Sequence, residues 1–179
     1  SSYMPDILFG MPKAWLPSAA GGENLGISLF NYGGENVEYC RKMAKVADYW
    51  VEKTGKNVIL LAFDVGTEND LAACEKVKRQ MQYADSARIV KHGMLGEIPN
   101  AFAECRKIIG ARFHSGVLSM KMNIDFYPIL YRRKMRNLIS DTAYPIGGCD
   151  IDSIDLEDIK TFLDTDKVDF SFDERYEDM

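Results

Sequence analysis

The chain has 179 residues, which is enough for one domain with a sizeable hydrophobic core and too few for two. Hydrophobic residues make up 46% of it, charged residues 27%, and the formal net charge is −5, as in ordinary globular domains. No apolar run approaches the ~20 residues of a membrane span, the first residues lack the pattern of a signal peptide, and no long basic stripe predicts nucleic-acid binding.

Charge is distributed unevenly along the chain. Residues 150–179 carry twelve acids against three bases, a net charge of −9, which leaves the other 149 residues at +4. The acidic end is typical of a solubilising surface. The mildly basic body would accept a small anion.

The four cysteines, at positions 40, 74, 105 and 149, are more than thirty residues apart. None belongs to the close pair that a zinc ribbon or a redox motif needs, so no metal site is expected. Their apolar surroundings predict buried thiols that act as small hydrophobic side chains in a reducing cytoplasm.

From residue 25 onward, strand patterns alternate with helix patterns. Residues 1–24, which contain three prolines and a Gly-Gly pair, are predicted to form a connecting segment, and residues 25–179 the folded domain. Short apolar runs predict strands, and apolar residues at helical spacing predict the helices between them. The predicted strands are 25–31, 57–63, 87–91, 107–111, 125–130 and 143–146. The predicted helices are 37–54, 70–81, 97–105, 114–122, 133–141 and 153–163.

Strict alternation of strands and helices predicts an α/β fold: a doubly wound, mostly parallel Rossmann-like sheet with helices on both faces. In the common strand order 3-2-1-4-5-6, strands one and four are neighbours where the order reverses. Ligands bind beyond the carboxyl ends of the strands at that switch point. This topology singles out the loops at residues 31–34 and 112–114.

The triplet Arg112-Phe113-His114 leads from the fourth predicted strand straight into a helix. A guanidinium is a planar cation suited to carboxylate or phosphate, and the first amides of a helix favour an anion at the same place. Ser115 and Gly116 would let a ligand approach closely, and His114 could exchange a proton near neutral pH. The alternative is structural: Arg112 pairs with a nearby acid, and His114 caps the helix.

A second basic cluster, Tyr131-Arg132-Arg133-Lys134-Met135-Arg136, follows the fifth predicted strand. Lys134 is the best placed of its cations to meet a ligand, and most of the others are expected to form a solvated helix face. Gly33-Gly34 after strand one could approach a phosphate, but it lacks the full glycine spacing of a dinucleotide site, which favours a tight turn. His92 follows the third strand without a partner motif and is left out of the site.

From Ile108 the sequence reads IIGARFHSGVLSMKMNIDFYPILYRRKMRNLISD. It resembles the signature of polysaccharide pyruvyl transferases, in which an Arg-x-His at a strand end is followed some twenty residues later by Tyr-x-x-Lys. The chain has both, and His114 and Lys134 are twenty residues apart. Residues 5–9 are similar to the family's Pro-Asp-x-Ala-Phe stretch. Asp125 stands where the family usually has Pro, which should alter the strand start more than the site.

The resemblance implies that residues 25–179 are the C-terminal, donor-binding half of a GT-B-like enzyme. Such enzymes transfer the enolpyruvyl group of phosphoenolpyruvate to a sugar of a cell-surface polysaccharide or exopolysaccharide as a pyruvate ketal. It implies catalytic roles for His114 and Lys134. It also implies that the donor is bound by Arg112, Phe113, His114, Ser115, Gly116 and Arg133. Phosphoenolpyruvate is the donor substrate, and neither a separate cofactor nor a metal ion is expected.

The implied partners are a saccharide or lipid-linked oligosaccharide acceptor and an N-terminal domain of the same polypeptide. Without that domain the chain is expected to be inactive. The implied location is the cytoplasm, including the inner face of the membrane. Two alternatives stay open: the nucleotide-sugar half of an ordinary GT-B glycosyltransferase, and a non-enzymatic flavodoxin-like binding module. The acids that a phospho-acceptor module carries after strand one are missing at residues 31–34.

Overall fold

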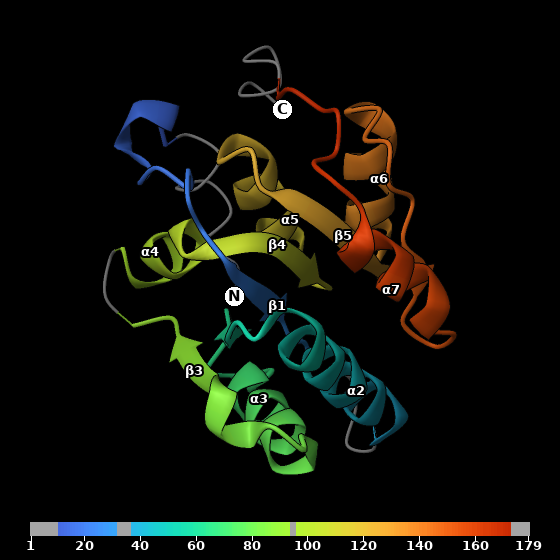
Figure 1. Cartoon of the computed structure of the whole chain (residues 1–179). Coiled ribbons are helices and arrows are strands. Elements are labelled where there is room, and N and C mark those ends of the chain that lie inside the picture. The colour runs from blue at the N-terminus through green and yellow to red at the C-terminus, as the bar shows by residue number, and fades with distance from the viewer. Residues whose placement is uncertain (1–10, 32–36, 94–95, 173–179) are drawn as a thin grey trace.

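The computed structural model describes residues 11–31, 37–93 and 96–172, so the stretch at residues 5–9 and the pair Gly33-Gly34 lie outside it. Its core is a six-stranded parallel sheet in the order β3-β2-β1-β4-β5-β6 (Figure 1). The strands are β1 (Asn24–Ser28), β2 (Val58–Ala62), β3 (Ala87–Lys91), β4 (Cys105–Gly110), β5 (Asp125–Leu130) and β6 (Cys149–Asp150). This confirms the predicted doubly wound fold and its switch point between β1 and β4.

Helices cover both faces of the sheet, as a doubly wound fold requires. They are α2 (Val37–Thr54), α3 (Asp70–Gln80), α4 (Glu97–Ala103), α5 (Phe113–Lys121), α6 (Arg133–Asp141) and α7 (Leu156–Asp164), with short 3-10 turns at Lys13–Trp15 and Ala84–Ser86. Buried side chains of α2, α3 and α7 form one core cluster with the sheet, and those of α4, α5 and α6 form the other. Within the described ranges, no helix combines the length and apolar character needed to cross a membrane.

The apolar pattern of the sequence explains most of these elements. All five residues of β2 are buried, as expected of a parallel strand covered on both sides. In α2, the buried residues recur at the spacing of one helix face: Tyr39, Cys40, Met43, Ala44, Val46, Ala47 and Trp50. The helical spacing in the sequence predicts five of them, Cys40, Met43, Ala44, Ala47 and Trp50, whereas Val37, which fits the same spacing, is 64% exposed. Three of the four cysteines are buried and the fourth, Cys149, is half-buried.

Part of the predicted connecting segment packs on the domain. Met11, Leu16 and Ala19 lie against the core cluster of α4, α5 and α6. The amides of Glu23 and Asn24 both donate to the carbonyl oxygen of Glu104, at 3.1 and 3.0 Å, just before β4. These contacts lead the chain directly into the centre of the sheet.

The prediction of the sixth strand at residues 143–146 was wrong, since β6 consists of Cys149 and Asp150. Ala143 has a φ of +52° and Gly148 a φ of +75°, and both values interrupt an extended run. Between them the hydroxyl oxygen of Tyr144 accepts a hydrogen bond from the amide of Phe126 at 2.8 Å. The chain therefore turns against β5 before it can join the sheet.

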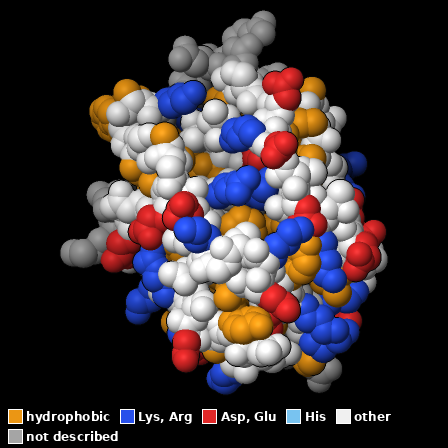
Figure 2. Space-filling model, viewed as in Figure 1, with side chains coloured by type: hydrophobic (Ala, Val, Ile, Leu, Met, Phe, Trp, Pro, Cys, Tyr) orange, Lys and Arg blue, Asp and Glu red, His pale blue; other side chains and the backbone are white. Residues whose placement is uncertain are grey.

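Lysine and arginine side chains gather across the middle of the face drawn in Figure 2, with acidic side chains between and beside them. Among the exposed charges of the described chain, Arg88 pairs with Glu104 at 2.7 Å and Lys56 with Glu23 at 3.1 Å. Exposed pairs contribute little to stability.

A buried ion pair lies at the amino ends of the central strands. The Nζ atom of Lys107 is 3.1 Å from a carboxylate oxygen of Asp125, and the two side chains are only 1% and 4% exposed. Asp125 also accepts the amide of Val168 and pairs with Lys167 at 3.1 Å, which fastens the segment after α7 to β5. Burial lowers the pKa of Lys107, although Asp125 opposes the shift. Asp125, the residue that departs from the family's proline, is thus the first residue of β5 and a structural anchor.

Replacing Asp125 with Asn should destabilise the fold by about 3 kcal/mol, because it leaves the buried ammonium of Lys107 without its counter-charge. The change can be measured as the free energy of unfolding in urea. Glu23→Gln is the matched control: it breaks the exposed pair with Lys56 and should cost under about 1 kcal/mol. Equal losses in the two variants would show that the buried pair contributes no more than a surface one.

Candidate functional site

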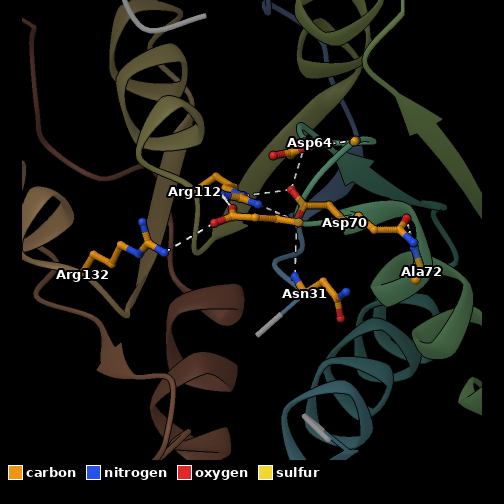
Figure 3. A network of polar contacts seen from close by, with 9 residues as sticks. Asn31, Asp64, Asp70, Ala72, Arg112 and Arg132 are labelled. Atoms are coloured by element: carbon orange, nitrogen blue, oxygen red, sulfur yellow. Dashed lines mark hydrogen bonds and ion pairs between the residues drawn. The ribbon is translucent and has the colours of Figure 1, made fainter. Parts of the chain in front are cut away.

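Arg112 lies directly after β4, at the N-cap of α5, and its guanidinium is held by two acids (Figure 3). Its Nε and Nη2 atoms donate to the two carboxylate oxygens of Asp70 at 2.8 and 2.6 Å, and its Nη1 atom pairs with Glu68. The guanidinium also lies over the ring of Phe30, 4.3 Å from the centroid. Burial lowers the pKa of Arg112, but the two carboxylates outweigh that effect and raise it, so the cation is permanent. The acid pairing considered as the structural alternative is therefore present.

Asp70, at the start of α3, is the fully buried partner in this network. Besides Arg112, it accepts the backbone amides of Asn31 at 3.2 Å and Asp64 at 3.1 Å. Asn69 caps the helix, with its side chain accepting the amide of Ala72 at 3.3 Å. Asp70 thus connects α3 to the chain segments after β1, β2 and β4, whose carboxyl ends meet at the switch point.

Glu68 connects the two halves of the sheet. Its second carboxylate oxygen is 3.4 Å from an Nη2 atom of Arg132, the N-cap residue of α6. Glu68 is 28% exposed and Arg132 is 64% exposed, so this contact is far more accessible to water than the one with Asp70.

His114 lies in the first turn of α5 between two aromatic rings. Its ring is stacked on Phe63 with centroids 6.5 Å apart and meets Phe113 edge-on at 5.7 Å. Burial, followed by the positive charges of Arg112 and Lys134, lowers the pKa of His114 to about 4. The expectation that it titrates near neutral pH was therefore wrong for the unliganded protein, in which the imidazole is uncharged at pH 7.

Lys134 lies in the first turn of α6, exposed to solvent. Its positive charge contributes to the lowered pKa of His114, after burial and Arg112. Within the part of the chain that the structure describes, Lys134 and the neighbouring Arg133 form no ion pair, whereas Arg132 pairs with Glu68 and Arg136 with Asp150. No contact places Arg133 at the switch point, and its role as a ligand-binding residue stays a prediction.

Ser115 and Gly116 are buried, so their role is in packing and not in the approach of a ligand. A Cβ atom at Gly116 would lie 2.9 Å from a Leu138 methyl group and 3.1 Å from the Phe126 ring, so the glycine allows α5 to pack on α6 and β5. The Ser115 hydroxyl donates to the carbonyl oxygen of Arg112 and closes the first turn. Neither residue is free to make room for a ligand, contrary to the prediction from the sequence.

Three buried side-chain atoms near the carboxyl ends of β1 and β4 have no hydrogen-bond partner among the described residues. They are Oγ of Ser28, Oδ1 of Asn31 and Nε2 of His114. Because buried polar atoms in native proteins are nearly always paired, such atoms call for a water molecule or a ligand. Their position at the switch point supports a polar ligand there.

Other features of the described chain are weaker candidates for a functional site. An open hollow of about 410 Å³ lies at the sheet edge, along β3 and α4, and none of its lining residues belongs to the predicted site. His92 follows β3, and its amide donates to Ala62 at 2.9 Å. In the ranges that the structure covers, no three His, Cys, Asp or Glu side chains are grouped to hold a metal ion.

Comparisons with known proteins give no assignment, since no protein-family model and no curated protein matches the chain.

Asp70→Asn should destabilise the protein by about 3 kcal/mol, because the amide nitrogen would face the donors of Arg112 and the cation would lose its buried counter-charge. Unfolding in urea measures the change. Glu75→Gln, which removes an exposed acid from the same helix, is the control and should stay within about 0.5 kcal/mol of the parent. An Asp70→Asn protein as stable as this control would contradict the role given to Asp70.

The lowered pKa of His114 predicts a loss of stability in acid. Between pH 6.5 and 4 the unfolded chain binds a proton at this residue and the folded chain does not, so the free energy of unfolding falls as the pH drops. Over the whole interval the loss is about 3 kcal/mol, and it ends near pH 4. Urea unfolding at several pH values should show this loss in the parent but not in His114→Gln. Identical pH profiles would show that the histidine titrates normally.

Proposed function

We propose that this chain is the C-terminal, donor-binding portion of a polysaccharide pyruvyl transferase and that phosphoenolpyruvate binds at the switch point between β1 and β4. The observation that carries the proposal is the environment of His114 in the first turn of α5. Its side-chain nitrogen Nε2 is buried with no hydrogen-bond partner among the described residues, and the positive charges of Arg112 and Lys134 act on the ring. His114 and Lys134 are the two residues that the resemblance to the family marks as catalytic.

The local charges suit a small, densely anionic donor. Lys134 has no acid partner in the described chain, and the first amides of α5 point their positive dipole ends to the same side of the sheet. Together they are suitable donors for the phosphate group. Arg112, oriented by Asp70, lies on the same side and offers its remaining N–H groups.

His114 would change its charge when the donor binds. In the unliganded protein it is neutral at pH 7, since its pKa is lowered to about 4. A phosphate dianion beside the ring would raise that pKa, because an opposite charge favours the imidazolium. His114 would then hold a proton only in the complex, where a general acid is needed.

In the proposed reaction, the proton moves to the methylene carbon of phosphoenolpyruvate, and the adjacent carbon becomes electrophilic. A sugar hydroxyl adds to that carbon and returns its proton to His114. The carbon–oxygen bond to the phosphate group then breaks, a second hydroxyl of the same sugar attacks the same carbon and closes the pyruvate ketal, and its proton leaves with the inorganic phosphate. Lys134 would stabilise the negative charge of the departing phosphate.

The acceptor is proposed to be a saccharide or lipid-linked oligosaccharide of a cell-surface polysaccharide. In the family that the sequence resembles, a second Rossmann-like domain completes the cleft. We therefore expect the 179-residue chain to bind the donor and to show little transferase activity by itself. Pyruvylation by this chain alone would contradict the proposal that a second domain is needed for transferase activity.

Ligand-induced stabilisation separates the proposal from a nucleotide-sugar site. Phosphoenolpyruvate at about 100 times its Kd should add about 2.7 kcal/mol to the free energy of unfolding, while UDP-glucose should add nothing. Lys134→Ala should weaken the binding of phosphoenolpyruvate about tenfold, the usual scale for a lost charged hydrogen bond. Lys45→Ala, which removes an exposed lysine of α2, should leave it unchanged. Stabilisation by UDP-glucose alone would instead favour a glycosyltransferase half, and a response to neither ligand would refute the proposed site.

A further inference from the structure

The two acids that hold Arg112 differ in how firmly they are themselves held. Asp70 is fully buried, accepts two backbone amides and belongs to a helix. Glu68 lies in the loop between β2 and α3, is 28% exposed, and makes only side-chain contacts, to Arg112 and Arg132. Asp70 is therefore the structural counter-ion of Arg112, and Glu68 is a displaceable one.

The geometry around Glu68 is that of a bridging carboxylate. One of its oxygens pairs with Nη1 of Arg112, at the end of β4, and the other lies 3.4 Å from Nη2 of Arg132, after β5. In the view of Figure 3, Arg112 lies between Arg132 and Asp70. A carboxylate between two guanidinium groups makes charge-assisted hydrogen bonds of the kind that recognise carboxylate ligands.

We infer that Glu68 occupies the subsite for the carboxylate of the donor and must move out for the ligand to bind. The inference depends on the proposed function, because it takes the ligand to carry a carboxylate as well as a phosphate. The carboxylate of the ligand would replace that of Glu68 between Arg112 and Arg132. Its phosphate would lie toward Lys134 and the first turn of α5.

Glu68 thereby sets the specificity of the site. A ligand with only a phosphate has one anionic group, which the first turn of α5 and Lys134 would hold, so Glu68 stays between Arg112 and Arg132 and keeps them neutralised. A ligand with both groups gains two guanidinium contacts when it expels Glu68. The affinity observed in the parent protein is then reduced by the fraction of time for which Glu68 fills the subsite.

Glu68→Gln tests the inference in the 179-residue chain, by titration calorimetry with phosphoenolpyruvate and, separately, with inorganic phosphate. The variant should bind phosphoenolpyruvate about tenfold more tightly than the parent, as expected if Glu68 leaves the subsite open about a tenth of the time. Inorganic phosphate should gain less than about twofold, which allows for the lost negative charge. Glu75→Gln removes the same charge from the exposed face of α3 and should change neither affinity. Glu68→Ala is a second variant without the carboxylate. It should show the same gain in affinity even if the glutamine side chain of the first variant disturbs the loop.

Each remaining outcome has a distinct meaning. Equal affinities of the parent and both Glu68 variants for phosphoenolpyruvate would overturn the role of Glu68 and leave the donor site intact. An equal gain for inorganic phosphate would overturn the carboxylate subsite, since the two arginines would then accept any anion. Absence of phosphoenolpyruvate binding in every variant would overturn the proposed function and the inference with it.

Discussion

The buried ion pair between Asp70 and Arg112 is the constraint on which the candidate site depends. A carboxylate with no exposed surface is stable only if its oxygens are satisfied, and here a guanidinium and two backbone amides satisfy them. Because the amides come from the segments after β1 and β2, and the guanidinium from the end of β4, three loops are positioned by one side chain. The geometry of the switch point is therefore set before any ligand arrives.

The two acids that neutralise Arg112 also determine the electrostatics of the site. Arg112 contributes little net positive charge to a ligand while both acids hold it, and His114 is neutral because it is buried beside two cations. Lys134 is the cation of this group without an acid partner in the described chain. An anionic ligand would place a negative charge beside these cations. That charge would raise the pKa of His114, so that the imidazole binds a proton, and the ligand would compete with Glu68 for Arg112. Binding and activation of the histidine are thus expected to be coupled.

The sequence was sufficient to predict the fold and its switch point, because both follow from local patterns. Apolar runs and helical spacing predict the alternation of strands and helices, and the alternation predicts the switch point. The partners of Arg112 could not be predicted in the same way. Asp70 is 42 residues from Arg112 in sequence, and an acid in the first turn of a helix is ordinarily read as a response to the helix dipole. The sequence predicts that Gly116 lets a ligand approach closely. The packing that requires a glycine there, against Leu138 and Phe126, exists only in the folded protein.

The two buried ion pairs lie at opposite ends of the central strands. Lys107, in the first half of β4, pairs with the first residue of β5, whereas Arg112 follows the last residue of β4. Five residues of nearly extended chain separate Lys107 from Arg112 by roughly 16 Å. Lys167 and Val168 of the acidic C-terminal region are attached to Asp125, at the end of the sheet opposite the site.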